Sequence, residues 1–185
     1  MADEVLELCA RAREGDLDAA SELVTLYHAK IFSYLRRLCG NDDDAADLAQ
    51  KTFFKVWTSI ASFQGRSSFS TWIHGIAFHV YGDWRRRTER LEHRENEWWE
   101  CCALEGPTPS DDAAEKDLAR HLYSAVERLE EESRQAVHLH YYQGLSLQET
   151  SQVLGVAAST LKYRLRAALD FIRSSVKEPM QDTHQ

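Results

Sequence analysis

The sequence contains few residues that turn a chain or end a regular element. Glycine occupies 8 and proline 3 of the 185 positions, which is sparse for an all-β protein that must turn about every ten residues. No run of about eighteen apolar residues occurs, so we expect no membrane span. The acidic first residues lack the apolar core of a secretory signal. The class that remains is an all-α cytoplasmic protein.

Cysteine is also scarce, and the 4 present are too few and too irregularly placed for a disulfide framework. The best zinc candidate combines Cys101 and Cys102 with His93 and His121. Adjacent cysteines lack the gap that lets two thiolates reach one tetrahedral metal, so we expect no metal site. No nucleophile–base constellation or glycine-rich phosphate loop occurs either. We therefore expect no cofactor and no enzymatic activity.

Negative charge is concentrated in one middle segment. The net charge is −8, yet residues 1–90 carry 13 acidic and 12 basic residues, and residues 118–185 carry 8 of each. Residues 91–117 carry 9 acidic and 2 basic residues, a net charge of −7. The same segment holds Pro107 and Pro109, which disfavour helix at and before their positions. We therefore expect two domains, 1–90 and 118–185, joined by an acidic linker over 91–117.

Apolar residues in the first half recur every three or four positions, which is typical of helices with one buried face. The three aspartates at 42–44 are capping candidates for the second of these helices. Residues 62–68 form a loop, and the basic run 85–87 ends the third helix. No segment alternates like a strand, so we expect a helical bundle. The stripes predict helices over residues 20–38, 45–60 and 72–84.

The second half ends in a helix-turn-helix pattern. Ser146 and Glu149 fit a capping box at the start of a short helix, Gly155 marks the turn, and a longer helix follows. Its apolar face is predicted to pack inward, whereas the basic and tyrosine side chains of its first two turns project outward, as a major-groove helix requires. A solvated basic helix is the alternative. The inward residues are Leu161, Leu165 and Leu169, and the outward ones Lys162, Tyr163 and Arg166.

Taken together, the two halves resemble the extracytoplasmic-function (ECF) sigma factors, members of the sigma-70 family of bacterial RNA polymerase. The resemblance extends from about Leu17 to Ile172, and two separate motif sets occur in the family's order. In the first half the motifs are residues 44–57, 63–73, 76–77 and 83–86; in the second they are 144–149, 154–156 and 159–165.

The resemblance implies a division of labour. The first domain, of the sigma region 2 type, would bind the clamp helices of the polymerase β′ subunit and melt the minus-ten promoter element. The second, of the region 4 type, would bind the β flap and read the minus-thirty-five element. The linker would thread toward the active-site channel of the polymerase. A channel that holds nucleic acid is lined by positive charge, so an acidic linker suits it. The implied core-polymerase surface is Asp43, Asp44, Asp47, Gln50, Lys51 and Phe54.

Minus-ten recognition requires an unstacked base between aromatic and polar walls, and cations for the phosphates. The loop 62–68 and the helix after it offer aromatic and polar walls for the base, and arginines for the phosphates. A plain turn with aromatic anchors and a solubilising arginine cluster are the alternatives. The minus-ten set is Phe63, Gln64, Arg66, Ser67, Phe69, Trp72, His79, Asp83, Arg85 and Arg86. The minus-thirty-five set is Ser159, Thr160, Lys162, Tyr163, Arg164 and Arg166.

Two region 2 positions depart from the family pattern. Ala46 and Lys51 stand where the family is usually acidic and faces a basic part of the clamp, so docking should be weaker. Either the neighbouring aspartates suffice, or binding is conditional on a modification such as phosphorylation of Thr52 by a kinase. Thr52 lies on the apolar stripe, which favours a buried structural role.

Region 4, and the helix that follows the loop 62–68, depart from the family pattern in smaller ways. Thr150 and Ser151 replace apolar or small residues, which predicts a looser core. Tyr163 and Ala167 alter the reading helix, and His79 stands where asparagine is frequent.

Two other functions compete with this interpretation. A stand-alone helix-turn-helix regulator would bind promoter DNA without polymerase and dimerise. An interaction protein bound by an anti-sigma factor would have no promoter activity. A sigma factor is expected to bind core polymerase and promoter DNA together, and to have an anti-sigma factor or a modifying kinase as a further partner.

Overall fold

A computed structural model describes residues 2–95 and 121–177 of the chain, and every regular element in these ranges is helical. The predicted all-α fold is confirmed. Residues 121–127 are helical and precede α6. None of the helices built from the described residues has both the length and the hydropathy that crossing a bilayer requires. The labelled elements are α1 (Ala2–Arg13), α2 (Leu17–Cys39), α3 (Asp42–Ser59), the 3-10 turn η1 (Ile60–Ser62), α4 (Phe69–Glu95), α6 (Glu131–Val137), the π-helical turn η2 (His138–Tyr142), α7 (Leu147–Leu154) and α8 (Ala158–Lys177).

Local side-chain chemistry sets where the helices begin and end. The predicted capping box at α7 is present, with Ser146 accepting from the Glu149 amide and Glu149 accepting from the Ser146 amide. The caps expected among residues 42–44 are wrong by one position. Asn41 is the N-cap of α3, and its side chain accepts from the Asp44 amide at 2.8 Å. The three aspartates instead occupy the first turn, where their negative charges interact favourably with the positive end of the helix dipole.

Two other helix predictions need correction. Helix α4 does not end at the basic run 85–87 but continues to Glu95, into the segment predicted as a linker. The sequence offers no proline or glycine to stop it before Gly106. On α8, Leu169 does not pack inward and is 36% exposed, whereas Ala168 and Ile172 are buried. The buried row therefore follows positions 161, 165, 168 and 172, the spacing of one helix face.

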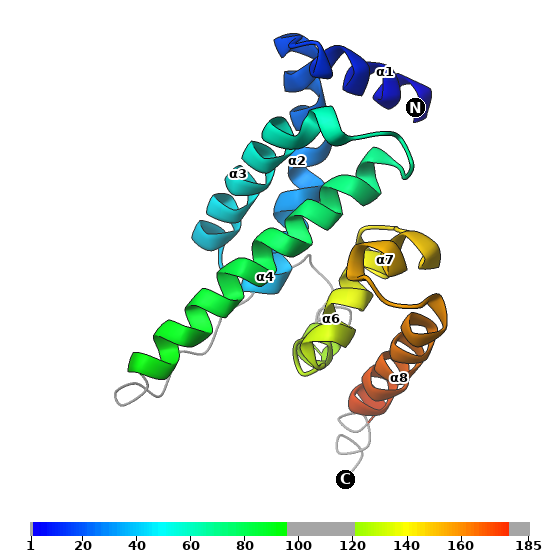
Figure 1. The fold of residues 1–185 in the computed structure, drawn as a ribbon. Coiled ribbons are helices and arrows are strands. Elements are labelled where there is room, and N and C mark those ends of the chain that lie inside the picture. Colours follow the sequence, from blue (N-terminus) through cyan, green and yellow to red (C-terminus); the bar gives the residue numbers. More distant parts are fainter. Residues whose placement is uncertain (1, 96–120, 178–185) are drawn as a thin grey trace, which may run out of the picture.

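The first helical unit packs α2, α3 and α4 against one another, and α1 crosses α2 (Figure 1). Many of its buried side chains belong to the predicted stripes, which confirms the helical periodicity. Tyr34 and Tyr81 lie fully inside this core, but only Tyr81 finds a partner, donating to the Leu38 carbonyl at 3.2 Å. The Tyr34 hydroxyl has no hydrogen-bond partner. Buried stripe residues include Leu23, Ile31, Leu35, Leu38, Leu48, Ala49, Val56, Ile73 and Ala77.

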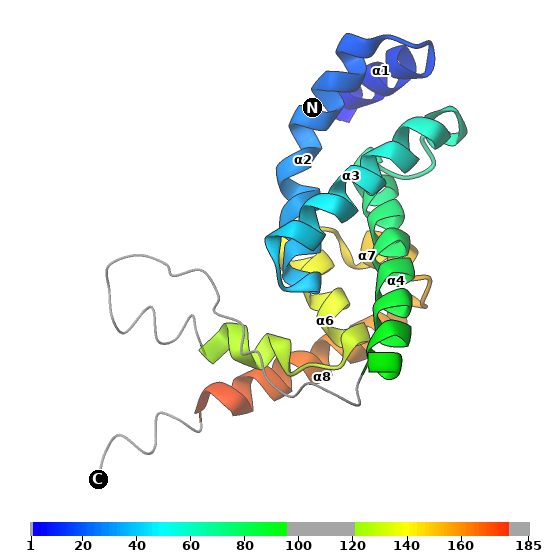
Figure 2. The same cartoon turned by 90° about the vertical axis from the view of Figure 1, so that its left-hand side faces the viewer.

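The second helical unit has its own small core and also shares the core of the first. Residues 121–129, α6 and α8 enclose one apolar cluster. Leu139, Leu145 and Val153, in contrast, join the buried cluster of the first unit. Both views show α7 beside α4, and η2 also packs on α2 (Figures 1 and 2). The two units therefore dock against each other in this structure.

The buried residue His138 lies at this junction. It is 1% exposed, and neither ring nitrogen has a hydrogen-bond partner. Its ring packs on Tyr142 at 5.2 Å between centroids. Burial, followed by the charges of Arg37 and Arg134, lowers the pKa of His138 to about 3, against a smaller raising effect of Glu131. The imidazole is therefore held neutral in the folded protein.

The two buried tyrosines provide a matched test of hydrogen bonding in the core. Tyr34→Phe removes a hydroxyl that is buried without a partner, so we expect the free energy of unfolding to rise by about 1 kcal/mol. Tyr81→Phe removes a hydroxyl that donates to Leu38, so we expect a fall of about 1 kcal/mol. Urea denaturation followed by circular dichroism measures both. Equal losses in the two variants would contradict this account of the core.

His138 makes stability depend on pH. Because its pKa is lower in the folded than in the unfolded chain, stability falls as the pH drops from about 6.5 towards 3. Between pH 7 and pH 4 the contribution is on the order of 3 kcal/mol. We expect His138→Phe to flatten this part of the pH dependence, whereas His28→Phe, at an exposed histidine, leaves it unchanged. Urea denaturation at a series of pH values measures the slope, and the same slope in both variants would refute the assignment.

Candidate nucleic-acid and polymerase interfaces

The predicted minus-ten loop is held by three packed aromatic rings. Phe63 lies 5.6 Å from Phe69 and 5.1 Å from Trp72 between ring centroids. Phe63 and Phe69 are buried and Trp72 is half-buried. The rings therefore anchor both ends of the loop, and its exposed side chains include Gln64 and Arg66, with Ser67 half-buried. A positive φ of 68° at Gly65 lets the loop turn between them.

The predicted strand-binding face of α4 brings its four residues together. His79 and Arg86 are exposed, whereas Asp83 and Arg85 are half-buried. Asp83 accepts from Arg86 at 2.6 Å and lies 3.5 Å from the Lys55 ammonium. Burial acts to raise the pKa of Asp83, but Lys55 and Arg86 hold it below its usual value. Asp83 therefore stays charged and positions two cations.

A hollow of about 300 Å³ opens beside this face. Its lining includes His79, Arg85 and Arg86 of α4, and also Gln135 from α6 of the second unit. Arg85 donates to Glu89 at 2.7 Å and lies 2.8 Å from Glu131. Glu89 also lines this recess, and both arginines are paired with carboxylates, so a phosphate group would compete with those partners. Helix α6 borders the recess.

The helix-turn-helix predicted from the sequence is formed by α7, Gly155 and α8. Gly155 adopts a φ of 66°, and Leu161 and Leu165 are buried. Arg164 is half-buried and pairs with Glu132 at 2.5 Å, so in this structure it faces the protein. Tyr163 is 75% exposed. The other predicted side chains are all exposed: Ser159, Thr160, Lys162 and Arg166.

The predicted polymerase surface forms one exposed face of α3. Lys51 makes an ion pair with Asp47, so one of the acids of this face is already partnered. Phe54 is 67% exposed, which is unusual for a phenylalanine on a polar helix face. Asp44 is half-buried and accepts from the Asn41 side-chain amide at 2.6 Å. The exposed members are Asp43, Asp47, Gln50, Lys51 and Phe54.

The structure assigns Thr52 and Thr150 to buried positions. Thr52 is fully buried and donates to the Leu48 carbonyl at 2.8 Å, so a kinase could not reach its hydroxyl in the folded helix. Thr150 is fully buried with its hydroxyl unpaired, whereas Ser151 donates to the Gln148 carbonyl at 2.8 Å.

The residues that join the two units carry no signal in the sequence. Glu149 Oε1 accepts from the Ser68 hydroxyl at 2.8 Å and from the Thr71 hydroxyl at 2.9 Å, both at the start of α4. The Arg37 guanidinium carbon lies 4.1 Å from the centre of the Tyr142 ring. The capping-box motif predicts only a local role for Glu149 at the start of α7. It does not indicate the hydroxyl partners about eighty residues earlier in the chain.

The structure describes only some of the residues that were considered as zinc ligands. No group of three or more histidine, cysteine or acidic side chains suited to a metal occurs in residues 2–95 and 121–177. Cys101 and Cys102 lie outside the described residues, as does most of the predicted linker.

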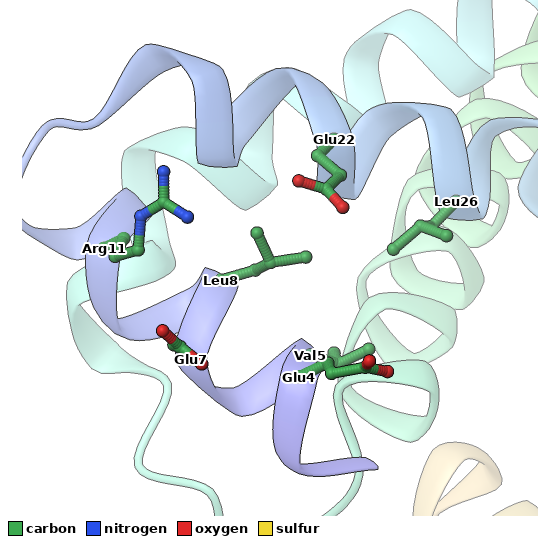
Figure 3. Close-up of a pocket in the computed structure, with 7 residues that line it drawn as sticks. All are labelled: Glu4, Val5, Glu7, Leu8, Arg11, Glu22 and Leu26. Atoms are coloured by element: carbon green, nitrogen blue, oxygen red, sulfur yellow. The ribbon is translucent and has the colours of Figure 1, made fainter. Parts of the chain in front are cut away.

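A second groove, of about 340 Å³, lies between α1 and α2 (Figure 3). Leu8 lies at its centre, and Glu4, Glu7 and Glu22 surround it with Arg11 (Figure 3). Three carboxylates make this groove unsuitable for a nucleic-acid backbone.

Comparison with known proteins matches both units to one family. Residues 23–91 match the Sigma-70 region 2 family, and residues 119–172 match the Sigma-70, region 4 family. The RNA polymerase sigma factor YlaC of Bacillus subtilis is 32% identical over 167 residues, which cover 86% of this chain and 94% of that protein. The ECF RNA polymerase sigma factor SigE of Mycolicibacterium smegmatis is 30% identical over 177 residues, covering 95% of this chain and 68% of that protein.

The fold also matches a solved structure. The sigma factor RpoE from Bartonella quintana, in complex with the anti-sigma factor NepR, superposes with a TM-score of 0.72. The match covers 85% of this chain and 96% of that one at 21% identity. Together with the two family matches in the expected order, these relatives show that the chain belongs to the ECF sigma factors of the sigma-70 family.

Proposed function

We propose that this chain recruits core RNA polymerase to a specific set of promoters through three surfaces. The exposed face of α3 binds the β′ clamp, the loop 62–68 with α4 takes the minus-ten strand, and α8 reads the minus-thirty-five element. The observation that carries the proposal is the pairing, in one chain, of an arginine-lined recess on α4 with an exposed Lys162, Tyr163 and Arg166 on a capped helix-turn-helix.

Within this proposal each surface has a definite chemical task. Arg85 and Arg86 neutralise strand phosphates, and exposed Gln64 and Arg66 can hydrogen-bond a base displaced from the stack. Phe63 and Phe69 act from within, because they fix the loop rather than touch DNA. Lys162 and Arg166 donate to base edges or phosphates in the major groove. The chain needs no catalytic group of its own, because the polymerase performs the chemistry.

We extend the proposal to the chain's regulation and location. The matched sigma factor RpoE was solved with an anti-sigma factor, and a partner of that kind would hold this chain away from polymerase. A modifying kinase is the other candidate regulator, acting at a site other than the buried Thr52. A polymerase subunit works where transcription occurs, which places the chain in the cytoplasm.

Run-off transcription with purified core polymerase and a genomic fragment library tests the function. We expect discrete start sites that depend on the chain. Phe54→Ala should reduce core binding at least tenfold, because an exposed aromatic ring is a typical interface anchor. Leu26→Ala, at a 48%-exposed leucine on α2, is the matched control and should bind normally. A chain that shifts promoter DNA alone and never changes initiation would be a stand-alone regulator instead.

The Lys51–Asp47 ion pair predicts the effect of a charge change on core binding. Lys51→Glu frees Asp47 and adds a negative charge to a face that, by family resemblance, meets a basic clamp surface. We expect core polymerase to bind this variant about fivefold more tightly at low salt, with a smaller gain at high salt. Lys30→Glu, an equal charge change at an exposed residue of α2, should have no effect. Pull-down titration measures both. Equal affinity of Lys51→Glu and wild type would show that the neighbouring aspartates suffice.

A further inference from the structure

The groove between α1 and α2 has an apolar floor that the protein leaves partly uncovered (Figure 3). Leu8 lies at its centre and is 7% exposed, Val5 is half-buried, and Leu26 of α2 is 48% exposed. The hollow that they line has a volume of about 340 Å³. Apolar surface beside an open hollow favours contact with an apolar group of another molecule, because that contact removes both surfaces from water.

The rim of the same groove is acidic. Glu4, Glu7 and Glu22 line it, and all three side chains are exposed. Arg11 is the one cation among the described residues of the lining, and it is paired at 2.7 Å with Asp16, which lies outside the lining. Glu7 and Glu22 also interact electrostatically with Arg11, but more weakly than Asp16 does. The rim therefore keeps an excess of negative charge, which attracts a cationic ligand.

The lining residues follow helical spacing on both walls of the groove. On α1 they are at positions 4, 5, 7, 8 and 11, and on α2 at positions 22 and 26. Residues three and four apart lie on one face of a helix, so each wall presents neighbouring side chains along the groove. The α1 wall spans about two turns, or about 10 Å. A partner helix of about two to three turns fits this length, with apolar side chains at i, i+3 or i+4 and i+7.

The longer segments of this chain outside the described residues carry the same sign of charge as the groove. Residues 96–120 carry 7 acidic and 2 basic residues, and residues 178–185 carry 2 acidic residues and no lysine or arginine. A second copy of the chain brings a net charge of −8. Because charges of one sign repel across a contact, charge complementarity favours a different protein with a basic surface.

We propose that the groove between α1 and α2 binds a basic amphipathic helix of another protein. Apolar side chains of that helix cover Leu8 and Leu26, and its lysine or arginine side chains pair with the glutamates of the rim. Exposed ion pairs contribute little to affinity, so the apolar contact holds the partner, and the acidic rim selects a basic helix over an acidic one. The inference goes beyond the proposed function and does not rest on it.

This partner differs from an anti-sigma factor that holds the chain away from polymerase. None of the described residues that line the groove belongs to the surfaces assigned above to core polymerase or to promoter DNA. The groove can therefore be occupied while polymerase is bound, and the partner would join the transcription complex rather than prevent its assembly.

The test titrates the full chain into a fluorescent basic peptide of about 14 residues that repeats the block Leu-Lys-Lys-Leu-Leu-Lys-Leu. Fluorescence anisotropy gives the affinity, and circular dichroism gives the helix content of the peptide on binding. The same peptide with glutamate in place of every lysine is the charge control. We expect the wild type to bind the basic peptide as a helix and to leave the acidic peptide unbound. A wild type that does not bind the basic peptide overturns the proposal.

Leu26→Ala tests the apolar floor of the groove. We expect this variant to bind the basic peptide about fivefold more weakly, because the change removes apolar contact surface. Leu17→Ala, at an 82%-exposed leucine of the same helix that does not line the groove, is the matched control and should bind normally. Equal affinity of Leu26→Ala and wild type would mean that the peptide is held by charge alone, which contradicts a docking groove.

Glu7→Gln with Glu22→Gln tests the acidic rim. We expect about fivefold weaker peptide binding at low salt and a smaller loss at high salt. Glu14→Gln with Asp18→Asn makes the same change in net charge at exposed positions outside the lining, and should bind normally. Equal weakening in the two pairs would show that the peptide responds to the net charge of the chain, and the proposal would be wrong.

Two further measurements separate this partner from the other possible occupants. Analytical ultracentrifugation of the chain alone should show no self-association, whereas a dimer that Leu26→Ala dissociates would make a second copy the occupant and overturn the proposal. The complex of the chain with core polymerase should bind the basic peptide as tightly as the free chain. Loss of peptide binding in that complex would make the groove part of the polymerase surface. A failure of run-off transcription leaves the peptide results unchanged, so failure of the proposed function is distinguishable from failure of this inference.

Discussion

The Glu149 carboxylate connects the two halves of this molecule. One oxygen completes the capping box that starts α7, and the other accepts from two hydroxyls at the start of α4. Burial alone would raise the pKa of Glu149, but the hydrogen bonds from Ser146, Ser68 and Thr71 hold it at about 2. The group is therefore an anion throughout the physiological range, and it ties the first helix of the helix-turn-helix, α7, to the start of α4.

The junction balances apolar burial against unpaired polar atoms. Leu139, Leu145 and Val153 favour docking because separation exposes them to water. Nε2 of His74 and both ring nitrogens of His138 oppose it because they are buried without a hydrogen-bond partner. The free energy of docking is the difference between these two opposing contributions.

The sequence predicts the local features well and the junction not at all. The helical stripes, the capping box at Ser146 and the helix-turn-helix depend on residues close together in the chain, and all three are confirmed. Leu169 was misplaced because a neighbouring position, Ala168, lies closer to the centre of the buried face of α8. Phe63 and Phe69 were expected to line a base pocket, but the burial of an aromatic ring depends on tertiary packing. The contacts of Glu149 and Arg85 join residues far apart in sequence, which periodicity cannot reveal.

The most direct measurement of the central claim is the distance between the two units with and without core polymerase. Spin labels carried by unnatural amino acids at Thr58 of α3 and Ala167 of α8 occupy exposed positions and leave the native cysteines in place. Pulsed electron paramagnetic resonance should give one short, narrow distance distribution for the free chain and a longer one with core polymerase. The same distribution in both states would contradict the account.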